Sequence, residues 1–276
     1  KKPKINLFST LSDLQKKSGC FYSVERDKRE SRIPKLHYKF YYKSLFIDTK
    51  SYILLDIIYC QNPYNNLNKK SLNEIPFLKN YKNIIVNVPT PEGLFGDKLT
   101  AISPDTIGIL LNDEKEMNFV KQVIDLGILF ELCNDVEEIL MVFNNISKIE
   151  NNFRGTRFTK EQILKSIFNI AYKYSQYSLR NSDNSFKEIS HLQNGLKRVT
   201  SHIVGKYNSN DLKIAFSKIA YICTRLKKKK YGDEIIKKTD FSLIDKIKFP
   251  DEYLVLEGLK KTNPKAYFYW FVGNGV

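Results

Sequence analysis

Three apolar stretches in the first third of the chain have the length and patterning of β-strands. Residues 36–46, LHYKFYYKSLF, alternate large apolar and polar side chains over their first half, whereas residues 52–60, YILLDIIYC, form an aliphatic and β-branched run. A shorter run, NIIVNVPTP at 83–91, ends in prolines. These patterns predict three strands, and the Asn-rich segment 61–76 predicts a loop between the last two.

From about residue 90 the apolar positions repeat every three to four residues, which predicts helices. Thr90 can cap a helix that begins with Pro91, and Thr159 and Gln162 have the spacing of a capping box. The periodic segments are 114–133, 135–149, 159–179, about 185–205 and 209–230, and NNFRGTRFT at 151–159 is the clearest loop. We therefore expect an α/β (α+β) core with a mixed sheet over residues 1–133 and an all-helical domain over 134–276.

The composition, 42% apolar and 27% charged residues, is that of a soluble globular protein. No apolar run approaches the ~20 residues that cross a bilayer, so we expect no membrane segment. The cysteines form no CxxC pair and the histidines no HExxH motif, which predicts neither a zinc site nor a disulfide framework and favours a reducing cytoplasm. These residues are Cys20, Cys60, Cys133, Cys223, His37, His191 and His202.

The start of the chain also carries information. The first methionine is Met117, so we expect that Lys1 is not the first residue of the encoded protein. We expect residues upstream of Lys1, and they are candidates to carry part of the function.

The chain is strongly basic, with 45 Lys and Arg against 30 Asp and Glu and a net charge of +15. Such an imbalance concentrates polyanions, although AT-rich codons also raise the lysine content. The cations of the second half form a candidate RNA surface, and the tyrosines at 172, 174, 177 and 207 are candidates to stack on bases. The alternatives are solvated helix ends and core tyrosines. The candidate cations are Lys197, Arg198, Arg225, Lys227, Lys228, Lys229 and Lys230.

Three charged residues stand out inside apolar segments. Asp56 lies in the most apolar predicted strand, Lys98 lies on the apolar side of the helix after Pro91, and Asp125 lies in a helix that is apolar almost all round. A carboxylate removed from water costs several kcal/mol unless it is paired or bound to a cation. Asp56, Lys98 and Asp125 are therefore candidate catalytic residues facing a cleft.

Each of these residues also has a purely structural interpretation. A lysine at the margin of an apolar face commonly lays its methylenes on the core and lifts its ammonium into water. Lys121, one helical turn before Asp125, can form an i, i+4 ion pair with it, which contributes only a few tenths of a kcal/mol.

Two carboxylates and a lysine that converge on a cleft suit phosphoryl or nucleotidyl transfer. Carboxylates hold Mg²⁺ or Mn²⁺, the metal bridges phosphate oxygens, and the lysine neutralises charge on a triphosphate. Lys98 is the first candidate for the nucleotide phosphates and Lys121 is the second.

The blocks PEGLFGDKLTAI and KQVIDLGILFEL resemble the paired blocks of the nucleotidyltransferase AbiEii/AbiGii toxin family, which includes the MenT-type toxins. The resemblance covers roughly residues 35–135. It implies a polymerase-β-like nucleotidyltransferase core followed by a helical domain. It also implies that Lys98 is the nucleotide-contacting lysine, Asp125 the acid of the last block and Asp56 the later strand acid.

The chain departs from the family at one point. The first block of the family is a Gly-Ser turn followed by an Arg-x-[Ser/Thr]-x-Asp-Ile-Asp stretch that provides metal-binding acids, and nothing similar stands in this sequence. We expect that block upstream of Lys1, with Asp56 as the metal-binding acid within this chain.

The sequence thus predicts a cytoplasmic nucleotidyltransferase toxin of a toxin–antitoxin or phage-defence pair. It would transfer a nucleoside monophosphate from an NTP to an acceptor, with tRNA first among the candidates and a cognate antitoxin as a further partner. Two alternatives stay open. One is a non-catalytic protein on the same fold that binds nucleic acid or a partner, and the other is an enzyme that AMPylates a protein.

Overall fold

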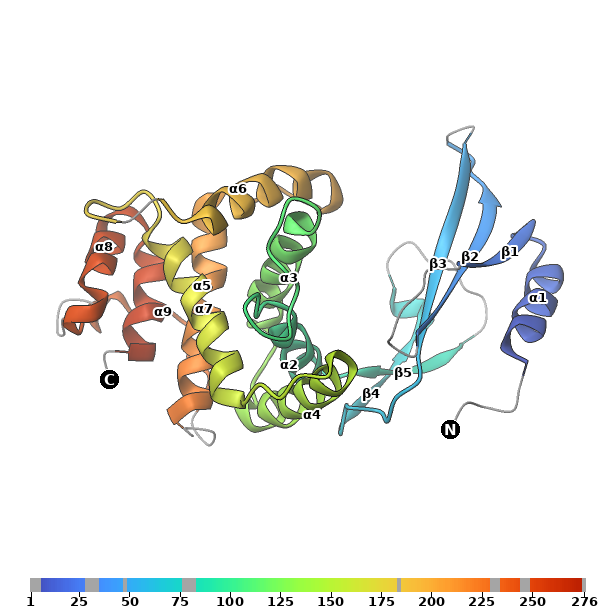
Figure 1. Cartoon of the computed structure of the whole chain (residues 1–276), viewed down its shortest axis with the longest axis horizontal. Coiled ribbons are helices and arrows are strands. Elements are labelled where there is room, and N and C mark those ends of the chain that lie inside the picture. Colours follow the sequence, from blue (N-terminus) through green and yellow to red (C-terminus); the bar gives the residue numbers. More distant parts are fainter. Residues whose placement is uncertain are drawn as a thin grey trace. The chain divides into compact units, whose positions relative to one another are not determined.

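The computed structural model describes residues 6–27, 35–46, 49–75, 83–182, 185–228, 234–243 and 249–274 (Figure 1). The fold is α+β and mostly helical. The chain divides into two compact units, Lys1–Asn62 and Pro63–Val276. The boundary expected after residue 133 lies inside the second unit, where α3 (Glu116–Leu129) packs against α7 (Ser209–Lys228).

The first unit consists of one helix and an antiparallel sheet. Helix α1 (Leu7–Ser18) is capped by the Asn6 side chain, which accepts a hydrogen bond from the Ser9 amide, and it ends at Gly19, whose φ of 64° suits glycine. Strands β1 (Ser23–Asp27), β2 (Lys35–Lys43) and β3 (Lys50–Ile58) follow in the spatial order β1-β2-β3. The strands predicted in 36–46 and 52–60 are confirmed.

The small core of this unit lies around β2 and α1. Tyr38, Tyr41 and Leu11 are buried, and the ring of Phe8 stacks on that of Tyr38 at 6.3 Å between centroids. By contrast, the apolar strand β3 lies at the edge of the sheet, and its Ile53 and Leu54 are 55% and 42% exposed. Its apolar composition therefore does not reflect burial within this unit.

The second unit opens with a β-ribbon. Strand β4 (Leu67–Ser71) pairs antiparallel with β5 (Ile85–Pro89), and a 3₁₀ turn, η1 (Leu72–Glu74), follows β4. Strand β5 confirms the third predicted strand, whereas β4 lies in a segment that we expected to be a loop. The expected mixed sheet is wrong for the described residues, because both of their sheets are antiparallel.

Helices make up the rest of the second unit. Thr90 caps α2 (Pro91–Ala101) by accepting from the Gly93 amide, and Thr159 and Gln162 form the predicted capping box of α5 (Lys160–Gln176). The described residues from Val136 onward contain no strand, in agreement with the expected helical second half. The remaining elements are α4 (Val136–Arg154), α5 (Lys160–Gln176), α6 (Lys187–Val199), η2 (Thr200–His202), η3 (Phe241–Leu243), η4 (Asp251–Gly258), α8 (Leu259–Thr262) and α9 (Pro264–Asn274).

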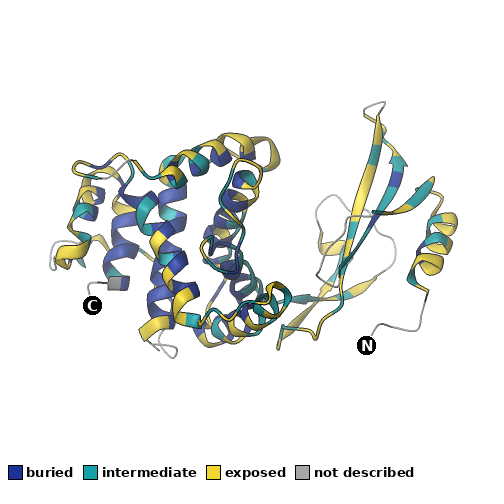
Figure 2. Cartoon of the chain, in the orientation of Figure 1, coloured by how far each residue is buried: buried dark blue, intermediate teal, exposed yellow. Residues whose placement is uncertain are grey.

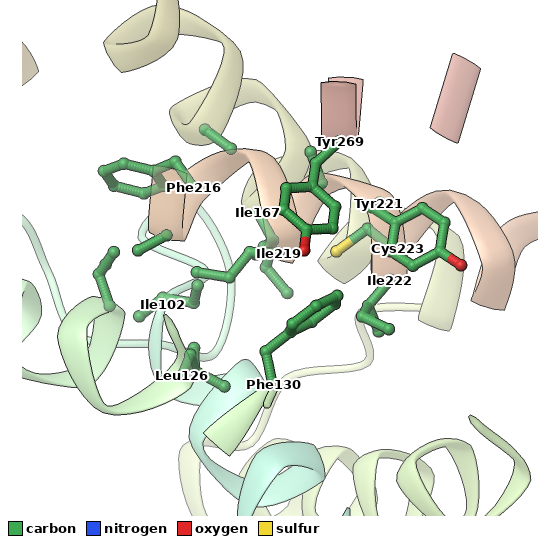
Figure 3. Packing of buried hydrophobic residues seen from close by; sticks show 14 of the residues in the cluster. Ile102, Leu126, Phe130, Ile167, Phe216, Ile219, Tyr221, Ile222, Cys223 and Tyr269 are labelled. Atoms are coloured by element: carbon green, nitrogen blue, oxygen red, sulfur yellow. The ribbon is translucent and has the colours of Figure 1, made fainter. Parts of the chain in front are cut away.

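The main hydrophobic core lies among these helices, as the dark blue residues in Figure 2 show. Helix α7 is its centre, since nearly all its residues from Leu212 to Leu226 are buried. Figure 3 shows Phe130 facing Tyr221 and Tyr269, and the ring centroids lie 6.1 and 5.2 Å apart. Helix α9, which the sequence pattern did not predict, adds the fully buried Trp270.

The four cysteines divide between the two units. Cys20 and Cys60 are exposed in the first unit, and Cys133 and Cys223 are buried in the second. All four are free thiols, in agreement with the expected absence of a disulfide framework. Burial raises the pKa of the Cys133 and Cys223 thiols well above the ordinary value.

Across the described ranges, no helix is both long enough and apolar enough to cross a membrane. This agrees with the absence of a long apolar run in the sequence.

Candidate functional site

The start of α2 is fixed by buried polar contacts. The Thr90 hydroxyl, besides capping α2, donates to Glu138 Oε1 of α4 at 2.6 Å, and Glu92 Oε1 accepts from the Asn134 amide at 2.7 Å. Gly96 allows the helices to approach closely, because a Cβ at this position would lie 2.6 Å from the carbonyl oxygen of Ile139. Together these contacts determine which face of α2 meets α4 and which remains for Lys98.

Lys98 points from α2 to α3, where it has two partners. Its Nζ donates to Asp125 Oδ2 at 2.8 Å and to Gln122 Oε1 at 3.0 Å. Gln122 and Asp125 are three residues apart in α3 and therefore share one face. The structure thus brings together two of the three predicted catalytic residues and adds Gln122, which the sequence reasoning missed.

The alternative ion pair within α3 is not formed. Lys121 is exposed, and among the described residues it has no ion-pair partner, because Asp125 pairs with Lys98 instead. The simple interpretation of Lys98 as a lysine that lifts its ammonium into water is also wrong, since the ammonium is held by a carboxylate and an amide oxygen.

The Lys98–Asp125 pair combines fixed geometry with access. The Lys98 and Asp125 side chains are 26% and 29% exposed, so the pair is partly shielded from water but reachable by a ligand. A partly buried ammonium fixed by two acceptors loses little side-chain entropy when it binds an anion. Phosphate oxygens are suitable ligands for such a compact positive charge.

Asp56 has a different environment from the one expected. It pairs across the sheet with His37, whose Nδ1 lies 2.5 Å from Asp56 Oδ1. The Asp56 side chain is 52% exposed and that of His37 is 16% exposed, so this carboxylate is not removed from water within its unit. Asp56 belongs to the first unit and Lys98 to the second, and their convergence stays a prediction.

The predicted RNA-binding cations separate into exposed and buried groups. Lys197, Lys227 and Lys228 are exposed, and Arg198 is half exposed while contacting Glu116. Arg225 differs from the expectation, because it is only 5% exposed and donates to the Tyr221 hydroxyl and to the carbonyl oxygen of Glu234. It stabilises the interior instead of offering a surface charge. Lys229 and Lys230 lie outside the described residues.

Most of the tyrosines considered as candidates to stack on bases contribute to the core, which was the alternative interpretation. Tyr174 is fully buried, and its hydroxyl contacts Ser209 and Gln193. Burial raises its pKa to about 12. Tyr172, Tyr177 and Tyr207 are half-buried, and Tyr172 and Tyr207 pack against the main core.

A second polar group lies where α3 and α6 meet. Asp113, Glu116 and His191 offer ligand atoms that all lie within 4.8 Å of one another, so this group could hold a metal ion. The sequence prediction considered only local motifs and did not anticipate this group. His191 is far along the chain from its acidic partners, and no local motif could have revealed the group.

No family model, curated protein or solved structure matches this chain. The resemblance to AbiEii/AbiGii toxins rests on the two sequence blocks alone, and the polymerase-β-like core stays a prediction. The Lys98 site must therefore be judged by the chemistry of its own residues.

Proposed function

We propose that this protein is a nucleotidyltransferase toxin that transfers a nucleoside monophosphate from an NTP to an RNA acceptor, with tRNA as the first candidate. The single observation that supports the proposal best is the partly exposed Lys98 ammonium, held 2.8 Å from Asp125 and 3.0 Å from Gln122. The two blocks that resemble the toxin family meet at this contact. A cognate antitoxin belongs to the same proposal.

In this reaction a hydroxyl of the acceptor forms a bond to the α-phosphorus of the NTP. The bond from that phosphorus to the leaving pyrophosphate breaks, and the hydroxyl proton passes to a general base. Negative charge develops on the phosphate oxygens, and Lys98 would neutralise it. Asp125 and Gln122 would hold the ammonium in place, and Lys121, exposed on the same helix, would be a second contact for the phosphates.

Asp56 would have a different role from Lys98, either as a metal ligand or as the general base that accepts the hydroxyl proton. Mg²⁺ that binds with nucleotide usually takes one or two carboxylates together with phosphate oxygens and water, so one partly exposed aspartate fits as a ligand. His37 would orient the Asp56 carboxylate through their contact. When bound, the metal would neutralise phosphate charge, as Mg²⁺ or Mn²⁺ does in phosphoryl transfer.

The experiment that tests this proposal supplies the protein, as its gene encodes it, with each of four α-labelled NTPs, Mg²⁺ and total tRNA. Label that enters tRNA and depends on the enzyme is the expected result. Label that enters protein instead identifies the AMPylation alternative. No transfer to either acceptor, together with saturable RNA binding, identifies the non-catalytic alternative and contradicts the proposal.

The exposed lysines of the second unit give a separate prediction about the acceptor. Changing Lys197, Lys227 and Lys228 to glutamate should weaken tRNA binding and flatten its salt dependence, because fewer counterions are released. For single-stranded RNA the slope of log K against log salt should fall by about 0.7 for each phosphate that the variant no longer neutralises. Filter binding at a series of salt concentrations measures both quantities.

The control for this experiment changes lysines in the first unit. Lys16→Glu and Lys17→Glu in the last turn of α1 lower the net charge by four units, against six for the three changes above, and both positions are exposed. They should leave the salt slope nearly unchanged. An equal loss of affinity per reversed charge in both sets would show that overall charge, and not this surface, governs RNA binding.

A further inference from the structure

The contact between α3 and α6 is unusually close at one point. A Cβ on Gly195 of α6 would lie 2.5 Å from the carbonyl oxygen of Glu116, the first residue of α3. On α6, His191 and Arg198 lie seven residues apart, two turns along one helix face, and both reach the start of α3. The backbone approach therefore holds two polar side chains of α6, His191 and Arg198, beside Glu116.

Glu116 is an unusual acid because its side chain is 5% exposed. Its Oε1 accepts from Arg198 Nη1 at 3.2 Å, and the same Nη1 donates to the carbonyl oxygen of Asp113 at 3.0 Å. Its position in the first turn of α3 also favours a negative charge. These contacts give Oε1 a hydrogen-bond donor and stabilise the negative charge of Glu116, but they do not include Oε2.

Glu116 Oε2 and His191 Nδ1 are both buried and have no hydrogen-bond partner. They lie 3.6 Å apart, and His191 Nδ1 is also 3.2 Å from Asp113 Oδ1. A neutral imidazole nitrogen with a free lone pair and two carboxylate oxygens would repel one another at these distances. A cation among the three atoms removes that repulsion and satisfies the two orphaned atoms.

We propose that Asp113, Glu116 and His191 bind one divalent transition-metal ion of the Zn²⁺ type, which fastens α6 to the start of α3. One imidazole and two carboxylates are a suitable donor set for Zn²⁺, with water completing the coordination. The three ligand atoms lie within 4.8 Å of one another. Each atom needs to move by less than about 1 Å to lie about 2.0–2.2 Å from a Zn²⁺ ion placed between them, which is the ordinary metal–ligand distance. The site contains neither Lys98 nor Asp125 and does not depend on the proposed nucleotide transfer.

The experiment measures Zn²⁺ binding to the chelator-treated whole protein by calorimetry and the Tm of the same samples by circular dichroism. One saturable equivalent should bind, and Tm should rise by about 5–10 °C at a Zn²⁺ concentration a hundred times Kd. His191→Gln should remove both effects. Asp113→Asn should weaken binding at least tenfold, and it is the variant least able to disturb folding because the Asp113 side chain is 90% exposed.

His202→Gln is the matched control, since His202 is exposed on η2 and belongs to no metal-binding group among the described residues. It should keep the full equivalent of Zn²⁺ and the full shift in Tm. The proposal is overturned if wild-type protein shows no saturable binding, or if the His191→Gln and Asp113→Asn variants bind as tightly as wild type. A Tm that is the same with and without Zn²⁺ also overturns it.

Discussion

Replacing Lys98 with alanine should reduce nucleotide transfer by about 10²–10³-fold while leaving folding nearly intact. Removal of one preorganised group that stabilises charge in the transition state commonly has an effect of this size. The ion pair itself, about a quarter exposed on each side, contributes less than about 1 kcal/mol to stability. Single-turnover transfer to tRNA and urea denaturation of the same samples measure the two effects. Lys98→Arg should restore only part of the rate, because a forked guanidinium does not replace a compact ammonium.

The chain offers a closely matched control for this substitution. Lys173 of α5 donates to Glu188 Oε1 at 2.7 Å, and the two side chains are 30% and 32% exposed. This hydrogen bond holds the pKa of Glu188 below its ordinary value. Lys173→Ala therefore breaks an equivalent pair away from Lys98 and should leave transfer unchanged.

A charge exchange separates catalysis from simple pairing. The double variant Lys98→Asp with Asp125→Lys keeps opposite charges in contact, so the free energy of unfolding should return close to the wild-type value. Transfer should stay low, because the ammonium no longer projects from α2. If the double variant regains wild-type transfer, or if Lys98→Ala transfers like the Lys173→Ala control, the catalytic role of Lys98 is refuted.

The largest loss of stability should follow from Trp270→Ala, at about 3–5 kcal/mol. Trp270 is fully buried, its Nε1 donates to Ser175 Oγ at 2.9 Å, and its ring meets Phe168 edge-on at 5.2 Å between centroids. The substitution leaves a cavity between α9 and α5 and removes the partner of a buried hydroxyl. Denaturation should be followed by circular dichroism, because Trp270 is the only tryptophan.

Two further variants provide comparisons for the loss of stability expected from Trp270→Ala. Trp270→Phe keeps an aromatic ring and should cost clearly less than Trp270→Ala. Phe46→Ala removes a ring that is 95% exposed and should change the free energy of unfolding by less than about 0.5 kcal/mol. A destabilisation below about 1 kcal/mol for Trp270→Ala would mean that α9 does not contribute to the cooperative core.

The sequence was most informative where local chemistry decides the structure. Thr90 before Pro91 and the Thr159–Gln162 spacing both predicted helix starts, because caps act within one turn. Strand β4 was missed because Asn68, Lys69 and Lys70 have low strand propensity. Its extended conformation is stabilised by pairing with β5. Helix α9 was missed because its run of aromatic residues is apolar on every side and has no helical period.

The same difference between local sequence signals and tertiary packing applies to the candidate sites. Lys98 and Asp125 could be singled out because each interrupts an apolar pattern, and Gln122 could have been found from its spacing of three residues to Asp125. Arg225 was misjudged because a cation in a basic run looks exposed until packing buries it. The group of Asp113, Glu116 and His191 could not be foreseen, since only the packing of α6 on α3 brings it together.

The positions of the four cysteines allow unfolding of the second unit to be followed by alkylation. Only a thiolate reacts quickly with an alkylating reagent, so Cys20 and Cys60, both exposed in the first unit, should be modified at once in the native protein. Cys133 and Cys223 are shielded by the helical core and should react only when the second unit opens. Mass spectrometry of labelled protein over time should therefore show two added groups immediately and four later. At reagent concentrations where alkylation outpaces reclosing, the rate of that second step is the rate at which the helical unit opens, and no engineered probe is needed.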